Sequence, residues 1–129
     1  NLRKILNFGH TFAHAYEATL KYSKKLNHGE AVILGIISAS KFSLKNNLLS
    51  IKEFKLIQSH LIKFNLPIKL KKHFTKKNLN EIIKFMKKDK KNNSKKINLV
   101  LLKKIGKPVF NINFNNKKLY TFLKTELIN

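Results

Sequence analysis

The sequence contains no cysteine. Disulfide bonds, cysteine-ligated zinc and thiol catalysis are therefore excluded, while the redox state of the compartment is left open. Any metal that this chain binds has to be held by histidine, aspartate or glutamate side chains. Five histidines and six acidic residues are available for that purpose.

Long apolar runs are missing as well. No segment approaches the roughly 20 apolar residues of a membrane span, and the first residues lack the apolar core of a signal peptide. We therefore expect a cytoplasmic protein with no membrane partner. The 129 residues suffice for one domain, 1–129, and because they open on Asn1 with a dense motif close behind, we expect a fragment of a longer protein.

Arginine is almost absent, although the net charge is +22. Such a charge alone suggests nucleic acid or an anionic surface as partner. Arg3 is the only arginine, however, and arginine supplies the bidentate contacts to phosphate and guanine. Lysine, asparagine and isoleucine are abundant. Their codons are AT-rich, so an AT-rich genome would favour them at surface positions where the choice of residue matters little. We interpret the lysines as solvated faces and expect no nucleic-acid partner, while some lysines remain available for an anionic substrate.

Apolar residues recur at helical spacing in five segments. The spacing predicts helices over residues 10–21, 29–45, 51–64, 75–88 and 117–127. The second has few charges and is expected to be the most buried. Ser50 and Glu53 indicate a capping box that opens the third helix, and Pro67 ends that helix. The apolar positions of the third and fourth helices are Ile51, Phe54, Ile57, Leu61 and Phe64, and Leu79, Ile82, Ile83 and Met86.

Two short apolar runs precede the last helix. Residues 97–102 and 109–114 flank a Gly-Lys-Pro turn at 106–108, which predicts a hairpin or a pair of strands. Residues 89–94 form a polar loop before them. The fold class is therefore mainly α, with one small β element.

A strip of polar side chains opens the chain. Arg3, Asn7, His10 and His14 follow one another at steps of three and four residues, so they share one face if the helix extends backward. If Gly9 breaks the helix, these side chains can still converge. An isolated pair of histidines four residues apart is usually a solvated helix face. The surrounding residues favour a functional interpretation: NFGHTFAHAYE at 7–17, followed by HGEAV at 28–32.

These two stretches resemble the signature of the 3-dehydroquinate synthase family, in which Asn-(Phe/Leu)-Gly-His-Thr-Phe-Gly-His-Ala-(Ile/Val)-Glu precedes His-Gly-Glu-Ala-Val. The similarity continues through Asn-Leu-Pro at 65–67, Asp-Lys-Lys at 89–91 and Val-Leu-Leu at 100–102. Ala13, Tyr16 and Asn65 depart from the usual Gly, aliphatic residue and Gly, and Asn92-Asn93 replace a stretch that often holds glycine. None of these departures removes a ligand-type side chain.

The resemblance implies the C-terminal helical domain of a dehydroquinate synthase-like fold, binding metal and substrate, without the N-terminal NAD-binding domain. The implied enzyme is a lyase of the shikimate pathway that converts 3-deoxy-D-arabino-heptulosonate 7-phosphate into 3-dehydroquinate and phosphate. It uses NAD, which is regenerated in each cycle, and a divalent metal, Zn²⁺ or Co²⁺. The resemblance also implies a homodimer for the full enzyme. No dinucleotide fingerprint occurs in this chain, so we expect the chain alone to be inactive.

The resemblance also assigns residues. It implies that His10 and His28 are metal ligands, that the third ligand is a carboxylate outside this sequence, and that His14 faces the substrate. It places Arg3 and Asn7 on the substrate's carboxylate or other oxygens, and Lys90 or Lys91 beside the anionic substrate. We accordingly expect imidazole nitrogens of His10 and His28 within roughly 3 to 5 Å of each other.

Other interpretations remain. Spacing alone would make His10 and His14, one helical turn apart, the pair of ligands. Glu17 and Glu30 are acid–base candidates, although a carboxylate at a helix start such as Glu30 commonly interacts with the helix dipole. The chain could instead belong to another sugar-phosphate cyclase of the same superfamily, or be a lysine-rich helical module that binds nucleic acid or an anionic surface.

Overall fold

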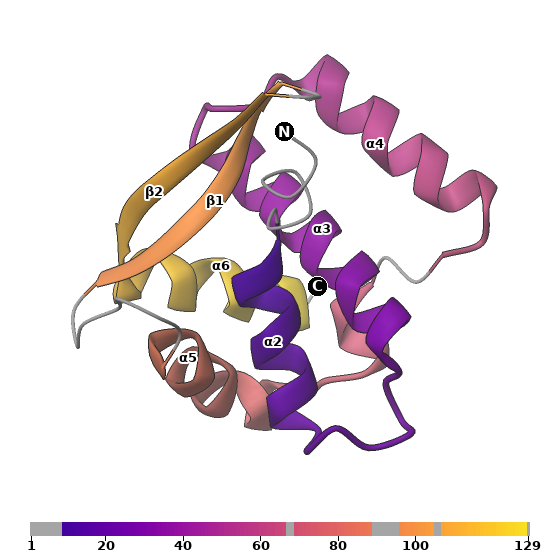
Figure 1. The fold of residues 1–129 in the computed structure, drawn as a ribbon, viewed down its shortest axis with the longest axis vertical. Coiled ribbons are helices and arrows are strands. Elements are labelled where there is room, and N and C mark those ends of the chain that lie inside the picture. The colour runs from indigo at the N-terminus through magenta and orange to yellow at the C-terminus, as the bar shows by residue number, and fades with distance from the viewer. Residues whose placement is uncertain (1–8, 67–68, 89–95, 105–106, 129) are drawn as a thin grey trace.

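The computed structural model describes residues 9–66, 69–88, 96–104 and 107–128. In these ranges helices predominate, and one two-stranded sheet accompanies them (Figure 1). The elements in chain order are α2 (His10–Thr19), α3 (His28–Lys45), α4 (Ile51–Lys63), the 3₁₀ turns η1 (Leu70–Lys72) and η2 (Lys76–Asn78), α5 (Leu79–Lys88), β1 (Lys96–Lys104), β2 (Lys107–Asn115) and α6 (Asn116–Ile128). The predicted fold class, mainly α with one small β-hairpin, is confirmed.

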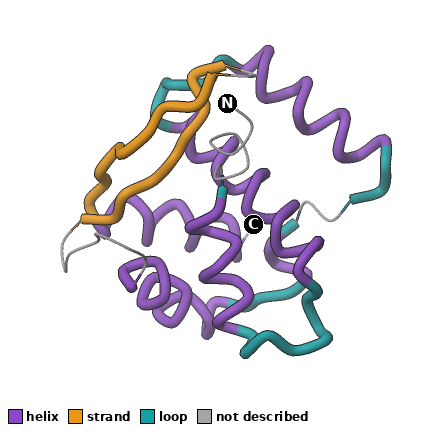
Figure 2. The backbone as a smooth tube through the Cα atoms, in the orientation of Figure 1, coloured by secondary structure: helices purple, strands orange, loops and turns teal. Residues whose placement is uncertain are grey.

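Helix α3 runs through the middle of the molecule and packs against α2, α4 and β1 (Figures 1 and 2). Its exposed residues lie only at its ends: His28 and Gly29 at the start and Lys45 at the finish. Leu34, Ile37 and Phe42 lie in the core between them. Low charge and small residues in a long helical segment thus predicted its central position correctly.

Helices α2, α3 and α4 end in the same way, on a residue in the left-handed conformation. After α4, Asn65 has φ 55°, its N–H donates to Ile62 O at 3.0 Å, and the N–H of Leu66 donates to Leu61 O at 3.0 Å. This pair of hydrogen bonds is a Schellman motif, which satisfies the last carbonyls of the helix. Lys21 and Asn47 hold the same position after α2 and α3, with φ of 55° and 60°. The left-handed turn at Lys21 explains why α2 stops at Thr19 and not at residue 21.

Helix α4 stands at the edge of the molecule and packs chiefly against α3 (Figure 1). The Oγ of Ser50 accepts from the Glu53 N–H at 3.1 Å, so the N-cap half of the predicted capping box is present. Phe54 and Leu61 are buried, whereas Ile51 and Phe64 are more than half exposed. The predicted apolar face is therefore covered only along its middle, because Ile51 and Phe64 lie at the two ends of the helix.

Helix α5 begins later than its apolar pattern predicted. Thr75 and Asn78 form a capping box around η2, which holds the first turn in 3₁₀ geometry, and α5 follows from Leu79. Its four predicted inward residues are all buried: Leu79, Ile82, Ile83 and Met86. Helix α6 closes the core with Leu119, Phe122, Leu123 and Leu127.

Strands β1 and β2 form the predicted antiparallel hairpin. Ile97 pairs with Phe114 and Leu99 with Ile112, and the register shifts between Leu99 and Leu101 and again between Leu102 and Lys104. The hairpin lies along one side of the helices and packs on α3 (Figure 2). No helix in the described part of the chain is long and apolar enough to cross a membrane.

Candidate functional site

The start of α2 is pressed against the second turn of α3. Gly9, the N-cap of α2, has φ 79°, a conformation that glycine adopts without steric cost. A Cβ added at Gly9 would lie 2.6 Å from the carbonyl carbon of Gly35, and one at Gly35 would lie 2.5 Å from Gly9 O. The two backbones therefore touch, and this contact fixes the position of His10, which follows Gly9 directly.

His10 and His14 lie side by side on α2. Their ring centroids are 3.8 Å apart with an interplanar angle of 55°, and both residues are exposed. One helical turn separates them, which is the neighbour relationship that the sequence spacing predicted. Two imidazoles thus face solvent together on the first turns of α2.

His28 is the first residue of α3, and it is held by Glu17 of α2. The Nδ1 of His28 lies 3.0 Å from Glu17 Oε2, the His28 side chain is 76% exposed and that of Glu17 only 11%. Glu17 follows His14 by three residues and His10 by seven, so it lies about 10 Å beyond His10 along the helix. Polar side chains therefore follow one face of α2 from His10 through His14 to Glu17. At the Glu17 end of this histidine strip, α3 places His28.

Glu30 fixes the backbone at the start of α3. Asn27 Oδ1 accepts from the Glu30 N–H at 2.8 Å, and Glu30 Oε1 accepts from the Asn27 N–H at 3.0 Å. This reciprocal pair is a capping box, and it places a carboxylate at the positive end of the helix dipole. The interpretation of Glu30 as a helix-start residue is thus supported by a specific contact that the sequence analysis did not identify, although Asn27 and Glu30 have the spacing that would have indicated it.

Several predicted site residues fall outside the described part of the chain: Arg3, Asn7, Lys90 and Lys91. Within the described part, no three histidine, aspartate or glutamate side chains gather closely enough to hold a metal ion. His14 is the ring that lies beside His10. The pairing of His10 with His28 as ligands of one metal stays a prediction.

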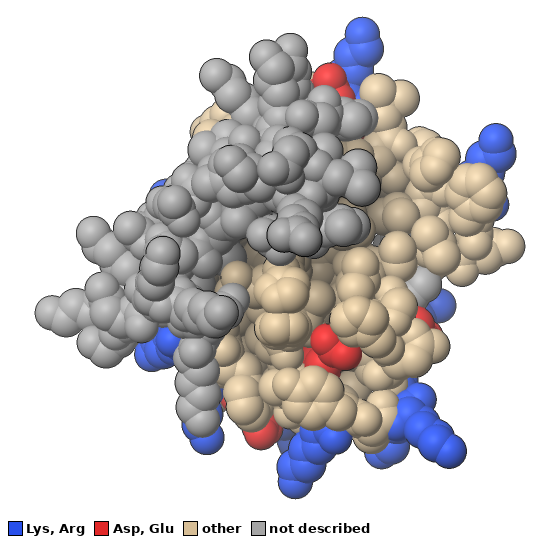
Figure 3. Space-filling model, viewed as in Figure 1, with Lys and Arg blue, Asp and Glu red and all other residues tan. Residues whose placement is uncertain are grey.

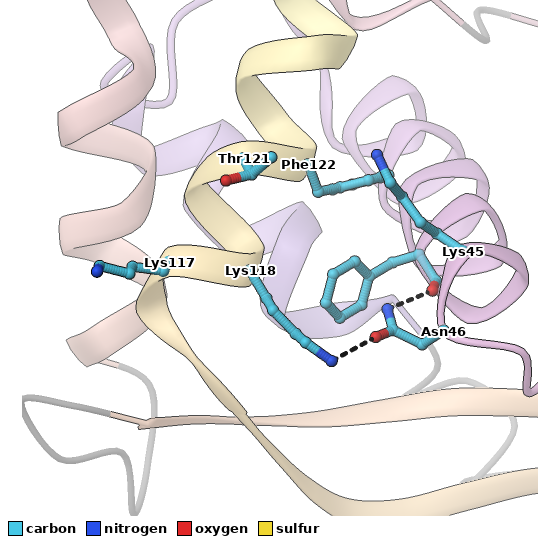
Figure 4. A pocket seen from close by; sticks show the side chains of 7 residues that line it. Lys45, Asn46, Lys117, Lys118, Thr121 and Phe122 are labelled. Atoms are coloured by element: carbon cyan, nitrogen blue, oxygen red, sulfur yellow. Dashed lines mark hydrogen bonds between the residues drawn. The ribbon is translucent and has the colours of Figure 1, made fainter.

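A pocket of about 320 Å³ lies at the other end of α3, between it and the start of α6 (Figure 4). Asn46 is held there from two sides: its Nδ2 donates to Phe42 O at 2.8 Å and its Oδ1 accepts from Lys118 Nζ at 3.4 Å. The remaining lining is Lys45, Lys117, Thr121 and Phe122. Since His28 begins α3 and this pocket adjoins its last turn, the pocket and the histidine strip are separate features.

Lysine side chains project at scattered points around the rim of the face shown in Figure 3 and do not gather into one patch of described residues. Dispersed lysines keep their ammonium groups hydrated and form no continuous track for a phosphate backbone. On this face the arrangement agrees with the interpretation of the lysines as solvated.

Comparison with known proteins adds independent information. The family described as "3-dehydroquinate synthase C-terminal" matches residues 1–92. The chain is 65% identical over 126 residues to a 3-dehydroquinate synthase of Pelagibacter ubique (strain HTCC1062), covering 98% of this chain and 34% of the relative. It is 44% identical over 108 residues to that of Endomicrobium trichonymphae, covering 84% of this chain and 28% of the relative. The chain thus spans about a third of the length of these relatives.

A solved structure shares the fold. A 2-deoxy-scyllo-inosose synthase complexed with carbaglucose-6-phosphate, NAD⁺ and Co²⁺ has a TM-score of 0.71 and 21% sequence identity, over 92% of this chain and 34% of that one. The family match covers more than half of the sequence, and it includes the glycine contact, both histidines of α2 and the His28–Glu17 pair. This chain belongs to the 3-dehydroquinate synthase C-terminal family.

Proposed function

We propose that this chain is the metal- and substrate-binding part of a 3-dehydroquinate synthase, which forms 3-dehydroquinate and phosphate from 3-deoxy-D-arabino-heptulosonate 7-phosphate. The observation that carries the proposal is the 65% identity to the Pelagibacter relative over nearly the whole chain. The solved cyclase is only 21% identical, so another sugar-phosphate cyclase activity is the weaker alternative.

The described histidines fit a divalent metal of the zinc or cobalt kind. Both His10 and His28 are exposed at helix starts, and imidazole nitrogens are ordinary ligands of these ions. The Nδ1 of His28 is engaged by Glu17, and its Nε2 makes no hydrogen bond within the described part of the chain. We assign these two histidines as ligands, with a carboxylate from a part of the protein outside this sequence as the third.

The remaining residues act on the substrate. His14 projects beside His10, where its ring can hydrogen-bond a substrate oxygen near the metal. Arg3 and Asn7 bind the substrate's carboxylate or hydroxyl oxygens, and Lys90 or Lys91 supplies a further cation. The metal would supply Lewis-acid polarisation of a substrate oxygen, and NAD the reversible oxidation of a hydroxyl. In this proposal NAD is bound by an N-terminal domain outside the sequence, and the full enzyme is a cytoplasmic homodimer.

A chimera tests the proposal. This chain would replace the matching third of the Pelagibacter enzyme, and phosphate release would be measured with 3-deoxy-D-arabino-heptulosonate 7-phosphate, NAD and Zn²⁺ or Co²⁺. We expect turnover by the chimera and none by the 129-residue chain alone. Activity on glucose 6-phosphate in place of the heptulosonate would instead indicate the alternative cyclase.

Single substitutions in the chimera test the residue assignments. His10→Ala and His28→Ala should abolish turnover and lower metal content, whereas His60→Ala should change neither, because His60 is exposed and packs on Phe64 at 5.1 Å between ring centroids. Arg3→Ala and the Lys90→Ala/Lys91→Ala pair should lower turnover without unfolding the protein. A chimera that binds metal normally without His10 or His28 would contradict the ligand assignment.

A further inference from the structure

Glu17 is a carboxylate in an unusual place. Its residue is 8% exposed, and it is the only acidic residue among the buried ones of the described part. A buried carboxylate is costly unless it is paired and hydrogen-bonded. Glu17 Oε2 lies 3.0 Å from His28 Nδ1, and His28 itself is largely exposed. A buried group of α2 therefore holds an exposed ring of α3.

This hydrogen bond determines which nitrogen of His28 carries the proton. A carboxylate oxygen accepts, so Nδ1 must donate, and in the neutral ring the lone pair is then left on Nε2. Free neutral imidazoles of histidine can adopt either tautomer, and the hydrogen bond made by one nitrogen decides the state of the other. With Glu17 on Nδ1, Nε2 is the atom that can coordinate.

Both partners of this hydrogen bond lie on helices whose starts are defined by specific contacts. Glu17 lies within α2, whose start is fixed by the backbone contact between Gly9 and Gly35. His28 is the first residue of α3, directly after the Asn27–Glu30 capping box. The hydrogen bond thus joins two defined helix positions, and it orients the His28 ring as well as selecting its tautomer.

We propose that Glu17 is a positioning residue: by accepting the Nδ1–H of His28 it presents Nε2 of that ring to the metal. The metal part of this inference rests on the proposed function, in which His28 is a ligand. Carboxylates behind metal-bound histidines elsewhere orient the ring and raise its basicity, and their loss weakens metal binding about 10- to 100-fold.

The tautomer is tested first, in the 129-residue chain without metal. Long-range ¹H–¹⁵N spectra of the side chains, recorded near pH 8.5, where an ordinary imidazole is neutral, distinguish Nδ1–H from Nε2–H. We expect His28 to be the Nδ1–H form in the native chain and to shift toward Nε2–H in Glu17→Ala and Glu17→Met. Methionine keeps the length of the side chain and favours a helix, so it serves where the alanine variant fails to fold. A predominant Nε2–H form in the native chain would overturn the proposal.

The metal is tested next, in the chimera, by competition of Co²⁺ or Zn²⁺ with a chelator. Glu17→Met should weaken the affinity about 10- to 100-fold. Glu81→Met is the matched control, because Glu81 is an exposed carboxylate of α5, and it should leave the affinity within about twofold. A purely structural Glu17–His28 pair would lower the melting temperature but leave the metal affinity of the folded protein unchanged.

The outcomes separate the two proposals. Affinity lowered by His28→Ala but unchanged by Glu17→Met would overturn the positioning role of Glu17 and keep the ligand assignment. Affinity unchanged by His28→Ala would overturn the ligand assignment itself, and with it the presentation of Nε2 to a metal. Loss of affinity in both variants, with an Nδ1–H ring in the native chain, would support both proposals.

Discussion

The hydroxyl of Tyr16 lies 2.6 Å from the hydroxyl of Ser38, and both residues are buried between α2 and α3. Tyr16 occupies a position where the resembled family usually has an aliphatic residue, and its ring packs on Phe74 at 5.4 Å between centroids. A buried phenol hydroxyl requires a hydrogen-bond partner, and Ser38 provides it.

The Tyr16–Ser38 hydrogen bond should appear as a coupling between two substitutions. We expect Tyr16→Phe to lower the free energy of unfolding by about 1 kcal/mol, and Ser38→Ala by about 1–3 kcal/mol because it leaves a buried phenol unpaired. Denaturant unfolding of both single variants and the double variant measures the coupling. The double variant should lose less than the sum of the single losses, and strict additivity would show that the hydrogen bond contributes nothing.

Alkaline pH should destabilise the chain through the same residue. Burial raises the pKa of Tyr16, with the Ser38 hydrogen bond opposing that rise in part. An acid whose pKa is higher in the folded state contributes stability that is complete below its unfolded pKa, about 10, and is lost as the pH rises above it. We expect the free energy of unfolding to fall more steeply above pH 10 in the native chain than in Tyr16→Phe. Tyr22→Phe is the control, because Tyr22 is 71% exposed, and it should follow the native curve.

Two glycines should respond in opposite ways to alanine. Gly9→Ala forces a Cβ into a left-handed residue and within 2.6 Å of the Gly35 backbone, so we expect a loss of about 2–4 kcal/mol in unfolding free energy. In Gly29→Ala the added Cβ would meet only Asn27 Oδ1, at 3.4 Å, in the first turn of a helix. That variant should be neutral or up to about 1 kcal/mol more stable. Equal melting temperatures for the two variants would contradict the close helix contact.

The left-handed residue after α4 gives a third comparison. Asn65 has φ 55°, and asparagine tolerates this region better than other non-glycine residues. We expect Asn65→Ala to lower the free energy of unfolding by about 1 kcal/mol and Asn65→Gly to leave it unchanged or raise it slightly. Thermal unfolding of the two variants decides this, and a stable alanine variant would show that the backbone turn relaxes.

Much of the fold could be predicted from local patterns. Apolar spacing located every α-helix of the described part, but not the 3₁₀ turn η1. The Gly-Lys-Pro segment located the hairpin, although Lys107 and Pro108 belong to β2 and not to the turn. Helix ends were predicted less well, because they depend on hydrogen bonds with little apolar signal: the left-handed Lys21 shortens α2, and the Thr75–Asn78 capping box delays α5. The exposure of Ile51 and Phe64 depends on which elements reach the ends of α4, and periodicity carries no such information.

The candidate site could be predicted in part. Spacing placed His10 beside His14, and the structure confirms that neighbourhood, whereas the assignment of His28 to the same site stays a prediction. The role of Glu17 could not be read from spacing, because its partner His28 is eleven residues away on another helix. The approach of His28 to His10 within ligand distance stays a prediction.

At the contact between Gly9 and Gly35, the start of α2 meets α3 backbone to backbone, with no side chain of either residue between them. At that point the separation of the helices is set by the thickness of the main chain, and not by side chains that could be exchanged for larger or smaller ones. A chain can then accumulate lysine and asparagine over its outer positions while the start of α2, which carries His10, keeps its place against α3. Substitutions on the surface therefore leave this helix contact unchanged.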